Sequence, residues 1–277
     1  MSVPIWQYIL AMICFTLVLF FIHEFFRRFL KITSVFFVLA LLTFPWWINN
    51  VNDWFLMAKT LLMVASIIIV NFSRLGYTFK SHKFPIFKST VPFWVIYTAL
   101  ILNILLALSP DLEIGNYYNA MAGIVLCITV PRPPKGWGTD RVRYKNHDLL
   151  VDLPILWCLL YVSWWMNLIY GSWPTIFNRG ICLVTATLIP MIIYKRADLW
   201  LSTRAYTLVI YLLSIALFNY SIPYIDTPVR PIRNILILWG VLNIILSSMQ
   251  ALYWFLRGRK KFIEKHSFTA SGVRSQN

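Results

Sequence analysis

The sequence contains little charge. Of its 277 residues, 13% are Asp, Glu, Lys or Arg and 59% are hydrophobic, whereas soluble domains have about 25% charged and about 45–50% apolar residues. Long windows carry no charged residue at all. A bilayer core of about 30 Å is crossed by about 20 apolar helical residues. The composition therefore excludes an ordinary soluble domain and favours a polytopic membrane protein.

Familiar catalytic and metal-binding motifs are also absent. The four cysteines form no CxxC pair and lie within apolar runs, where a free cysteine acts as a small hydrophobic residue. The chain has no G-x-x-x-x-G-K-[ST] loop, no G-x-S-x-G, no H-E-x-x-H and no aspartate-rich prenyl-diphosphate pattern. We therefore expect no cofactor and no metal site, and the sequence leaves open whether the protein is an enzyme.

Nine apolar segments of spanning length follow one another along the chain. They predict an all-α, polytopic bundle that occupies residues 1–256 as one domain, followed by a basic cytoplasmic tail at 257–277. The predicted spans are 5–26, 31–49, 54–73, 91–109, 114–130, 151–170, 175–194, 199–222 and 233–256. The fifth span is the shortest and reaches about 26 Å at 1.5 Å per residue, so it crosses only if it stands nearly upright.

Lysine and arginine are distributed unevenly between the connections. Most of them follow the first, third, fifth and seventh spans or lie in the tail, while the other connections hold Asp53, Asp111, Glu113 and Asp226. The positive-inside rule then places the N-terminus outside and the C-terminus in the cytoplasm. The net charge of +15 is thus a topology signal that also favours anionic lipids of the cytoplasmic leaflet as partners. No nucleic-acid partner is expected, because no reading motif accompanies the charge, and the oligomeric state is left open.

Polar residues inside the predicted spans are candidates for a substrate or ion path, because a charge at a helix centre costs about 2.5–3.5 kcal/mol. These candidates are Glu24, Arg27, Lys59, Asp152, Arg204, Asn103 and Asn243. One hypothesis is that Glu24, Asp152 and Arg204 line a polar vestibule at the cytoplasmic end. The interpretation we favour is local pairing of Glu24 with Arg28, together with arginines that reach the headgroups, and Lys59 is likewise interpreted as reaching the headgroups with Asp53 as partner.

The segment 131–152 is the only long polar connection between spans. Its Gly-Trp-Gly turn is followed by Arg141, Arg143 and Lys145, which are candidates for binding an anionic headgroup or phosphate. Further on, Asp148 and Asp152 are spaced to share one face at the start of a helix. Together with the neighbouring His147 they fit acid–base chemistry or a metal site, or else a simple helix cap.

Several short stretches carry a resemblance. They are 23–28 (HEFFRR), 54–59 (WFLMAK), 119–124 (NAMAGI), 204–208 (RAYTL) and 152–154 (DLP). These stretches resemble a family of bacterial multi-spanning membrane proteins of unknown function, with His23 standing where that family has Asn. The resemblance implies a bacterial inner (cytoplasmic) membrane and no particular activity. It again selects Glu24, Arg27, Lys59, Asp152 and Arg204.

The in-span charges and amides, together with the basic cytoplasmic connections, predict transporter- or channel-like passage of a small polar or anionic solute. Two alternatives remain at this stage. One is a membrane-embedded enzyme that acts on a lipid or isoprenoid at the cytoplasmic face through the 131–152 loop. The other is a non-catalytic membrane assembly protein.

Overall fold

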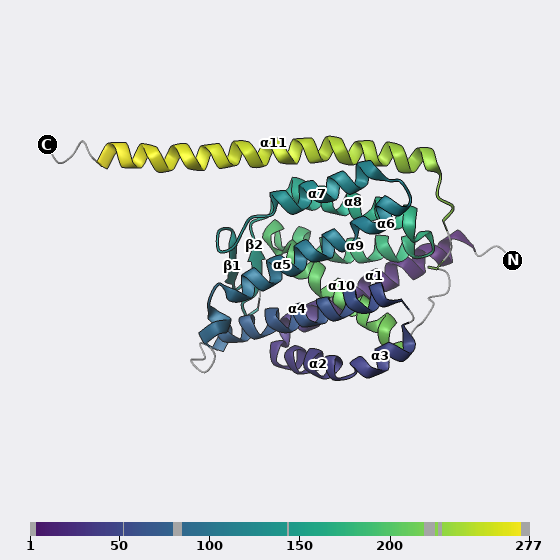
Figure 1. The fold of residues 1–277 in the computed structure, drawn as a ribbon. Coiled ribbons are helices and arrows are strands. Elements are labelled where there is room, and N and C mark those ends of the chain that lie inside the picture. Colours follow the sequence, from purple (N-terminus) through teal and green to yellow (C-terminus); the bar gives the residue numbers. More distant parts are fainter. Residues whose placement is uncertain are drawn as a thin grey trace.

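The computed structural model describes residues 4–51, 53–79, 85–142, 144–218, 225–226 and 229–272, with side chains up to residue 257. Its helices pack side by side along a common direction (Figure 1). They are α1 (Ile5–Arg28), α2 (Leu30–Leu42), α3 (Phe44–Asn50), α4 (Trp54–Phe79), α5 (Val91–Leu106), α6 (Leu108–Glu113), α7 (Tyr117–Thr129), α8 (Ile155–Ser172), α9 (Phe177–Tyr194), α10 (Trp200–Phe218) and α11 (Arg233–Gly272), with short 3-10 turns η1 (Pro85–Lys88), η2 (Pro174–Ile176) and η3 (Ala197–Leu199).

The described residues contain seven helical segments long and apolar enough to cross a membrane, or eight if α2 and α3 form one bent span. This agrees with the predicted multi-pass helical bundle but does not confirm nine spans. The difference lies in the fifth predicted span, where α7 has only 13 residues. At 1.5 Å per residue it reaches about 20 Å, which is short of a bilayer core of about 30 Å.

The second predicted span, 31–49, is broken in two. The helices α2 and α3 meet at an angle of 56°. Pro45 lies in the first turn of α3, where its missing N–H and its ring are tolerated, whereas inside a continuous helix they would remove a hydrogen bond and clash with the preceding turn. The Thr43 hydroxyl donates to the carbonyl of Ala40 (2.6 Å) at the break.

The 131–152 connection, which was predicted to be a loop, contains a β-hairpin within the otherwise helical bundle. Strand β1 (Trp137–Asp140) pairs antiparallel with β2 (Asp148–Val151), with Trp137 opposite Val151 and Asp140 opposite Asp148. The helix predicted to begin at 151 begins instead at Ile155. Pro154 explains the shift, because it disfavours the helical conformation at the preceding residue, Leu153.

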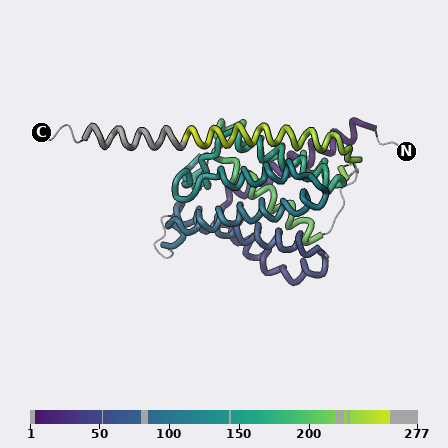
Figure 2. The backbone as a smooth tube through the Cα atoms, turned by 45° about the horizontal axis from the view of Figure 1, so that its top comes forward, coloured from purple at the N-terminus to yellow at the C-terminus, as the bar shows by residue number. Residues whose placement is uncertain are grey.

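Two helices are longer than predicted. The helix α4 continues from the expected end at 73 to Phe79, which places Arg74 inside the helix rather than in a connection. The helix α11 continues from 256 into the predicted tail and ends at Gly272. Figure 2 shows α11 lying along one side of the bundle, where it packs against α7 and α8.

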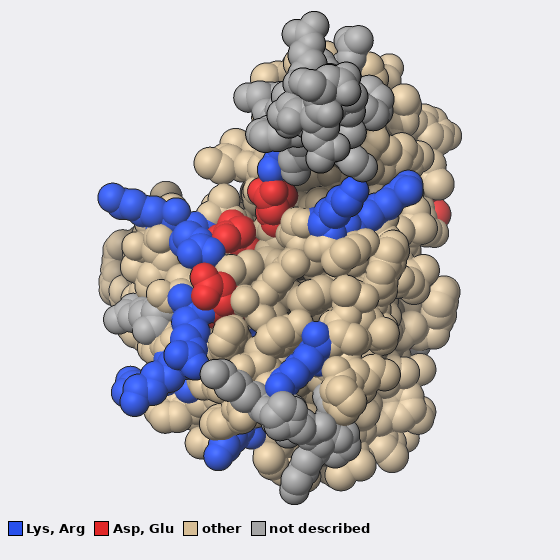
Figure 3. All heavy atoms as spheres, turned by 90° about the vertical axis from the view of Figure 1, so that its left-hand side faces the viewer, with Lys and Arg blue, Asp and Glu red and all other residues tan. Residues whose placement is uncertain are grey.

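One end of the bundle collects the basic connections (Figures 1 and 3). The C-terminal ends of α1, α4 and α9 lie there, together with the hairpin. Exposed basic side chains at this end include Arg28, Lys31, Arg132, Lys135, Arg141 and Lys145. Asp198 raises the pKa of the neighbouring Arg196, because its carboxylate accepts hydrogen bonds from that guanidinium. We refer to this region as the basic end.

Candidate functional site

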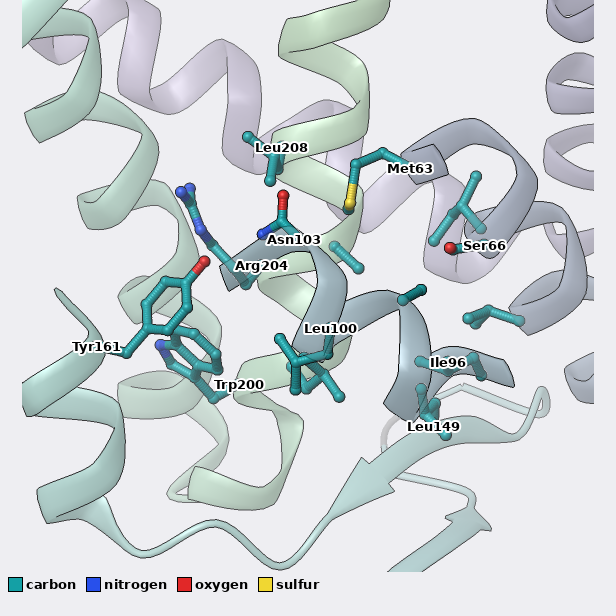
Figure 4. A pocket seen from close by; sticks show the side chains of 15 residues that line it. Met63, Ser66, Ile96, Leu100, Asn103, Leu149, Tyr161, Trp200, Arg204 and Leu208 are labelled. Carbon is teal, nitrogen blue, oxygen red and sulfur yellow. The ribbon is translucent and has the colours of Figure 1, made fainter. Parts of the chain in front are cut away.

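A small cavity lies among α4, α5, α8, α10 and β2 (Figure 4). Its volume is about 40 Å³. Eleven of its fifteen lining residues are apolar, and the four polar ones are Ser66, Asn103, Tyr161 and Arg204. Helix α4 packs against both α5 and α10 and so holds the two walls of the cavity in place. Leu149 of the hairpin forms part of the lining on the side of the basic end.

Arg204 lies in the cavity wall without a hydrogen-bond acceptor. Its side chain starts about 6 Å inside α10 and is 3% exposed. None of its three nitrogens has a hydrogen-bond partner among the described residues. The hydroxyl of Tyr161 is directed toward it (Figure 4), and the ring of Trp165 lies 4.2 Å from the guanidinium carbon. Buried charges in proteins are normally paired, so Arg204 is an exception.

Lys59 is a second buried cation near Arg204. It is 7% exposed, and Met63, which lies one turn further along α4, lines the cavity together with Arg204. Its ammonium nitrogen is 5.6 Å from the centre of the Phe55 ring. No ion pair of Lys59 occurs in the described part of the chain, and the expected partner Asp53 instead accepts a hydrogen bond from the backbone N–H of Phe55. The predicted local pairing of Lys59 with Asp53 is therefore wrong.

The two predicted path amides lie in different places. Asn103 lines the cavity together with Arg204, is 5% exposed, and its side-chain oxygen has no hydrogen-bond partner among the described residues. Asn243 of α11 instead belongs to an interhelical network described below. Of these two amides, only Asn103 therefore lies at the cavity with Arg204.

A buried ion-pair network ties the hairpin to the helices at the basic end. Asp148 of β2 is 1% exposed and accepts two hydrogen bonds from Arg27 (3.2 and 2.7 Å) and one from Arg74 (3.0 Å). Arg74 also donates to the hydroxyl of Tyr206 (2.5 Å), which in turn donates to Asn71. Since Asp148 precedes Leu149, this network fixes the strand that closes one side of the cavity.

Glu24 completes the same network. It accepts hydrogen bonds from Arg27 (2.7 Å) and from the hydroxyls of Tyr144 and Tyr194 (2.8 Å each). Its carboxylate also lies 3.4 Å from the fully buried ring of His23. The predicted partner Arg28 is replaced by Arg27, one residue earlier, so Glu24 and Arg27 are bonded within the protein rather than directed into the cavity.

The predicted vestibule of Glu24, Asp152 and Arg204 is not formed. Glu24 bonds within the network, Arg204 lies at the cavity, and no hydrogen bond or ion pair joins them among the described residues. Asp152 is exposed and pairs with Arg257 at 2.6 Å. The shared helical face of Asp148 and Asp152 is also wrong, because Asp148 lies on a strand and both residues precede α8.

The basic residues of the 131–152 connection lie at the surface. Arg141 and Lys145 are exposed, and Arg143 lies outside the described residues. Within the described part of the chain, no group of three or more His, Cys, Asp or Glu side chains is arranged to hold a metal ion. His147 contributes through its backbone, since its N–H donates to Thr78 and its carbonyl accepts from Arg74.

An amide network joins α6, α7, α8 and α11 away from the cavity. Asp111 is fully buried and accepts hydrogen bonds from Asn116 (2.9 Å) and Asn119 (2.7 Å). The Asn119 oxygen accepts from Asn243 (2.7 Å), whose own oxygen accepts from Ser163 (2.6 Å). Because every link crosses between elements, the network attaches α11 to the bundle, which is the usual role of buried amides between membrane helices.

Asn119→Leu is expected to destabilise the protein strongly. The substitution removes bonds to Asp111, Asn243 and the carbonyl of Trp164 and leaves buried polar groups unsatisfied at about 1–3 kcal/mol each. Asn103→Leu makes the same change at another buried site, where the side-chain oxygen has no partner among the described residues, so little loss is expected there. Thermal unfolding in detergent measures both, and equal midpoints for the two variants would contradict the assigned role of the network.

Arg74 and Tyr206 are the important residues that the sequence-based site prediction did not include, whereas it considered Asp148 at a helix start and not in an ion-pair network. Arg74 follows the predicted end of its span and was assigned to a connection. The signal was present in the spacing, because Asn71 and Arg74 are three residues apart and share one face of α4 if the helix continues. Tyr206 carried no charge to mark it.

Comparisons with known proteins do not place this chain in a family. Neither a family model, nor a curated protein, nor a solved structure matches this chain.

Proposed function

We propose that this integral membrane protein conducts a small anion and binds it at Arg204 and Lys59. The observation that supports the proposal is the burial of Arg204 at a cavity with none of its nitrogens hydrogen-bonded. A charge inside a membrane helix is costly and is a mark of function. Neither Lys59 nor Arg204 forms an ion pair with a carboxylate among the described residues, so an arriving anion would supply the partner that both lack.

The enzyme alternative has less support. It relied on Asp148 and Asp152 as catalytic groups of the 131–152 connection. Asp148 is buried and bonded to two arginines, so it is not free to exchange a proton with a substrate or to bind one. Asp152 is exposed and paired with Arg257. Arg204 and Lys59, in contrast, are buried and form no ion pair in the described part of the chain, and this favours anion passage over the enzyme.

We further propose that the basic end faces the cytoplasm of a bacterium and contacts anionic lipid of the inner membrane. The exposed Arg141 and Lys145 support this orientation, since Lys and Arg are retained on the cytoplasmic side and each contributes about 1 kcal/mol of attraction to an anionic surface. In this orientation the N-terminus is outside. The short helix α7 then also crosses the membrane, which brings the number of spans to nine.

Anion flux into proteoliposomes tests the proposed passage. Wild-type protein should move at least one of chloride, nitrate, acetate or phosphate faster than protein-free liposomes. Arg204→Gln and Lys59→Gln should each lower that flux about tenfold or more, because a loss of 1.4 kcal/mol of anion stabilisation already corresponds to tenfold. Arg28→Gln removes the same charge from an exposed position and should leave the flux unchanged.

Two outcomes would overturn the proposal. One is wild-type flux equal to that of empty liposomes for all four anions. The other is an Arg204→Gln variant that folds and conducts like wild type.

A further inference from the structure

The carboxyl group of Asp111 lies on α6, at the end of the bundle away from the hairpin (Figure 1). We infer that Asp111 is a proton-binding site whose proton exchanges with the solution. This inference concerns a different group from the proposed anion site and does not depend on it. It follows from the burial of the carboxyl group, its lack of a cationic partner among the described residues, and the direction of its hydrogen bonds.

Asp111 differs from the other buried carboxyl groups in the described part of the chain. These are Glu24 and Asp148, and each of them pairs with an arginine. Asp111 is equally buried, yet it forms no ion pair with any described residue. Taking an ionised carboxyl group out of water without a partner is costly, and such a group is commonly neutralised instead. Asp111 therefore needs a cation from outside the chain.

One donor to Asp111 is fixed in direction by an indole. The N–H of Trp239, which can only donate, bonds to the Ser163 hydroxyl (2.9 Å). That hydroxyl donates to the oxygen of Asn243, whose NH2 group donates to the oxygen of Asn119. The NH2 group of Asn119 then donates to one carboxyl oxygen of Asp111 (2.7 Å). The Asn119 oxygen is thus turned away from the carboxyl group.

The other carboxyl oxygen receives a donor that is fixed by a backbone carbonyl. The carbonyl of Leu236, which can only accept, bonds to the NH2 group of Asn167 (3.5 Å). The oxygen of Asn167 accepts from the NH2 group of Asn116 (3.3 Å), which also donates to Asp111 (2.9 Å). A metal ion would need oxygen ligands around the carboxyl group, but the amide nitrogens face it. A proton needs no further ligand, so it is the cation that this site accommodates.

The surroundings of Asp111 support both protonation states. The two amide donors favour the ionised form, whereas burial favours the neutral form. Glu113 and Gly115, two and four residues further along the chain, are exposed, so the carboxyl group lies close to the surface of the protein. The balance of the two effects and the short distance to the surface allow the proton to be taken up and released.

No fixed charge on the neighbouring helices decides the protonation state. The helices α5, α7 and α8 pack against α6 and contain no Asp, Glu, Lys, Arg or His. On α6 itself, Glu113 is exposed and accepts a hydrogen bond from Ser109. The neighbouring helices contribute tyrosines, which are uncharged at neutral pH, namely Tyr117, Tyr118, Tyr161 and Tyr170, while their remaining tyrosine and their cysteines lie nearer the basic end.

Infrared spectroscopy of the purified protein in detergent tests this inference. A protonated carboxyl group has a C=O band that an ionised one lacks, and the chain has only 10 Asp and Glu residues to assign. Wild type at mildly acidic pH should show such a band, which fades as the pH is raised and returns as it is lowered. Asp111→Asn should remove the band. Asp111→Glu keeps a carboxyl group and should shift it.

Asp152→Asn is the matched control. It removes an exposed carboxylate that pairs with Arg257, so the band should stay as in wild type. A wild-type spectrum without the band, or a band that is unchanged in Asp111→Asn and in Asp111→Glu, overturns the inference. A band that does not respond to pH overturns the exchange of the proton. If Asp111→Asn does not fold, the pH response of wild type and the shift in Asp111→Glu decide. None of these outcomes bears on anion flux, which tests the proposed function separately.

Discussion

Arg204→Met is expected to give a protein that is more stable than wild type and inactive in flux. Burying an ion costs several kcal/mol even after local relaxation, and replacing buried charged groups by apolar ones of similar volume often stabilises by about 1–4 kcal/mol. Arg204 is 3% exposed and has no acceptor. The cation–π contact with Trp165 offsets only part of this, about 2 kcal/mol. Methionine fills the space flexibly.

A gain in stability combined with a loss of flux identifies a functional residue. A residue kept for structure lowers stability when it is removed, whereas a residue kept for binding against the demands of folding raises it. The thermal midpoint of Arg204→Met in detergent measures the effect on stability, and proteoliposome flux measures the effect on function. A midpoint well below that of wild type would show that Arg204 has a structural partner and would remove the basis for the anion site.

Asp148→Asn is expected to destabilise the protein by about 3–5 kcal/mol, the usual loss when one member of a buried ion pair is removed. The buried network holds Arg27 and Arg74 against Asp148 and Glu24. The substitution leaves two cations with one carboxylate in a region that is closed to solvent. It also releases the strand whose next residue, Leu149, lines the cavity, so anion flux should change as well.

Asp152→Asn provides the matched control. It makes the same chemical change four residues later in the same connection, where the carboxylate is exposed and pairs with Arg257 at the surface. Surface ion pairs contribute little to stability, so the midpoint should stay close to that of wild type. Comparable losses in the two variants, measured by thermal unfolding in detergent, would mean that the hairpin is not fixed through Asp148.

The sequence by itself determined the class of the protein and the chemistry of its candidate residues. Apolar runs of spanning length predict helices, because in a bilayer each backbone polar group must be bonded within its own segment. The same cost of burial singled out Glu24, Arg27, Lys59 and Arg204 as residues with a special role. These predictions use only one residue or one segment at a time.

The tertiary structure decided which of the charged residues pair with one another. Arg27 and Arg204 are equally charged and both lie toward the basic end of the bundle. Arg27 nevertheless meets Asp148, 121 positions along the chain, whereas Arg204 packs against the aromatic side chains of Tyr161 and Trp165. The hairpin that delivers Asp148 was hidden by the apparent continuity of residues 148–152 with α8, which Leu153 and Pro154 interrupt. Whether a buried charge has a partner within the protein or is left to bind a ligand depends on which distant elements pack beside it. Spacing along one chain does not contain that information.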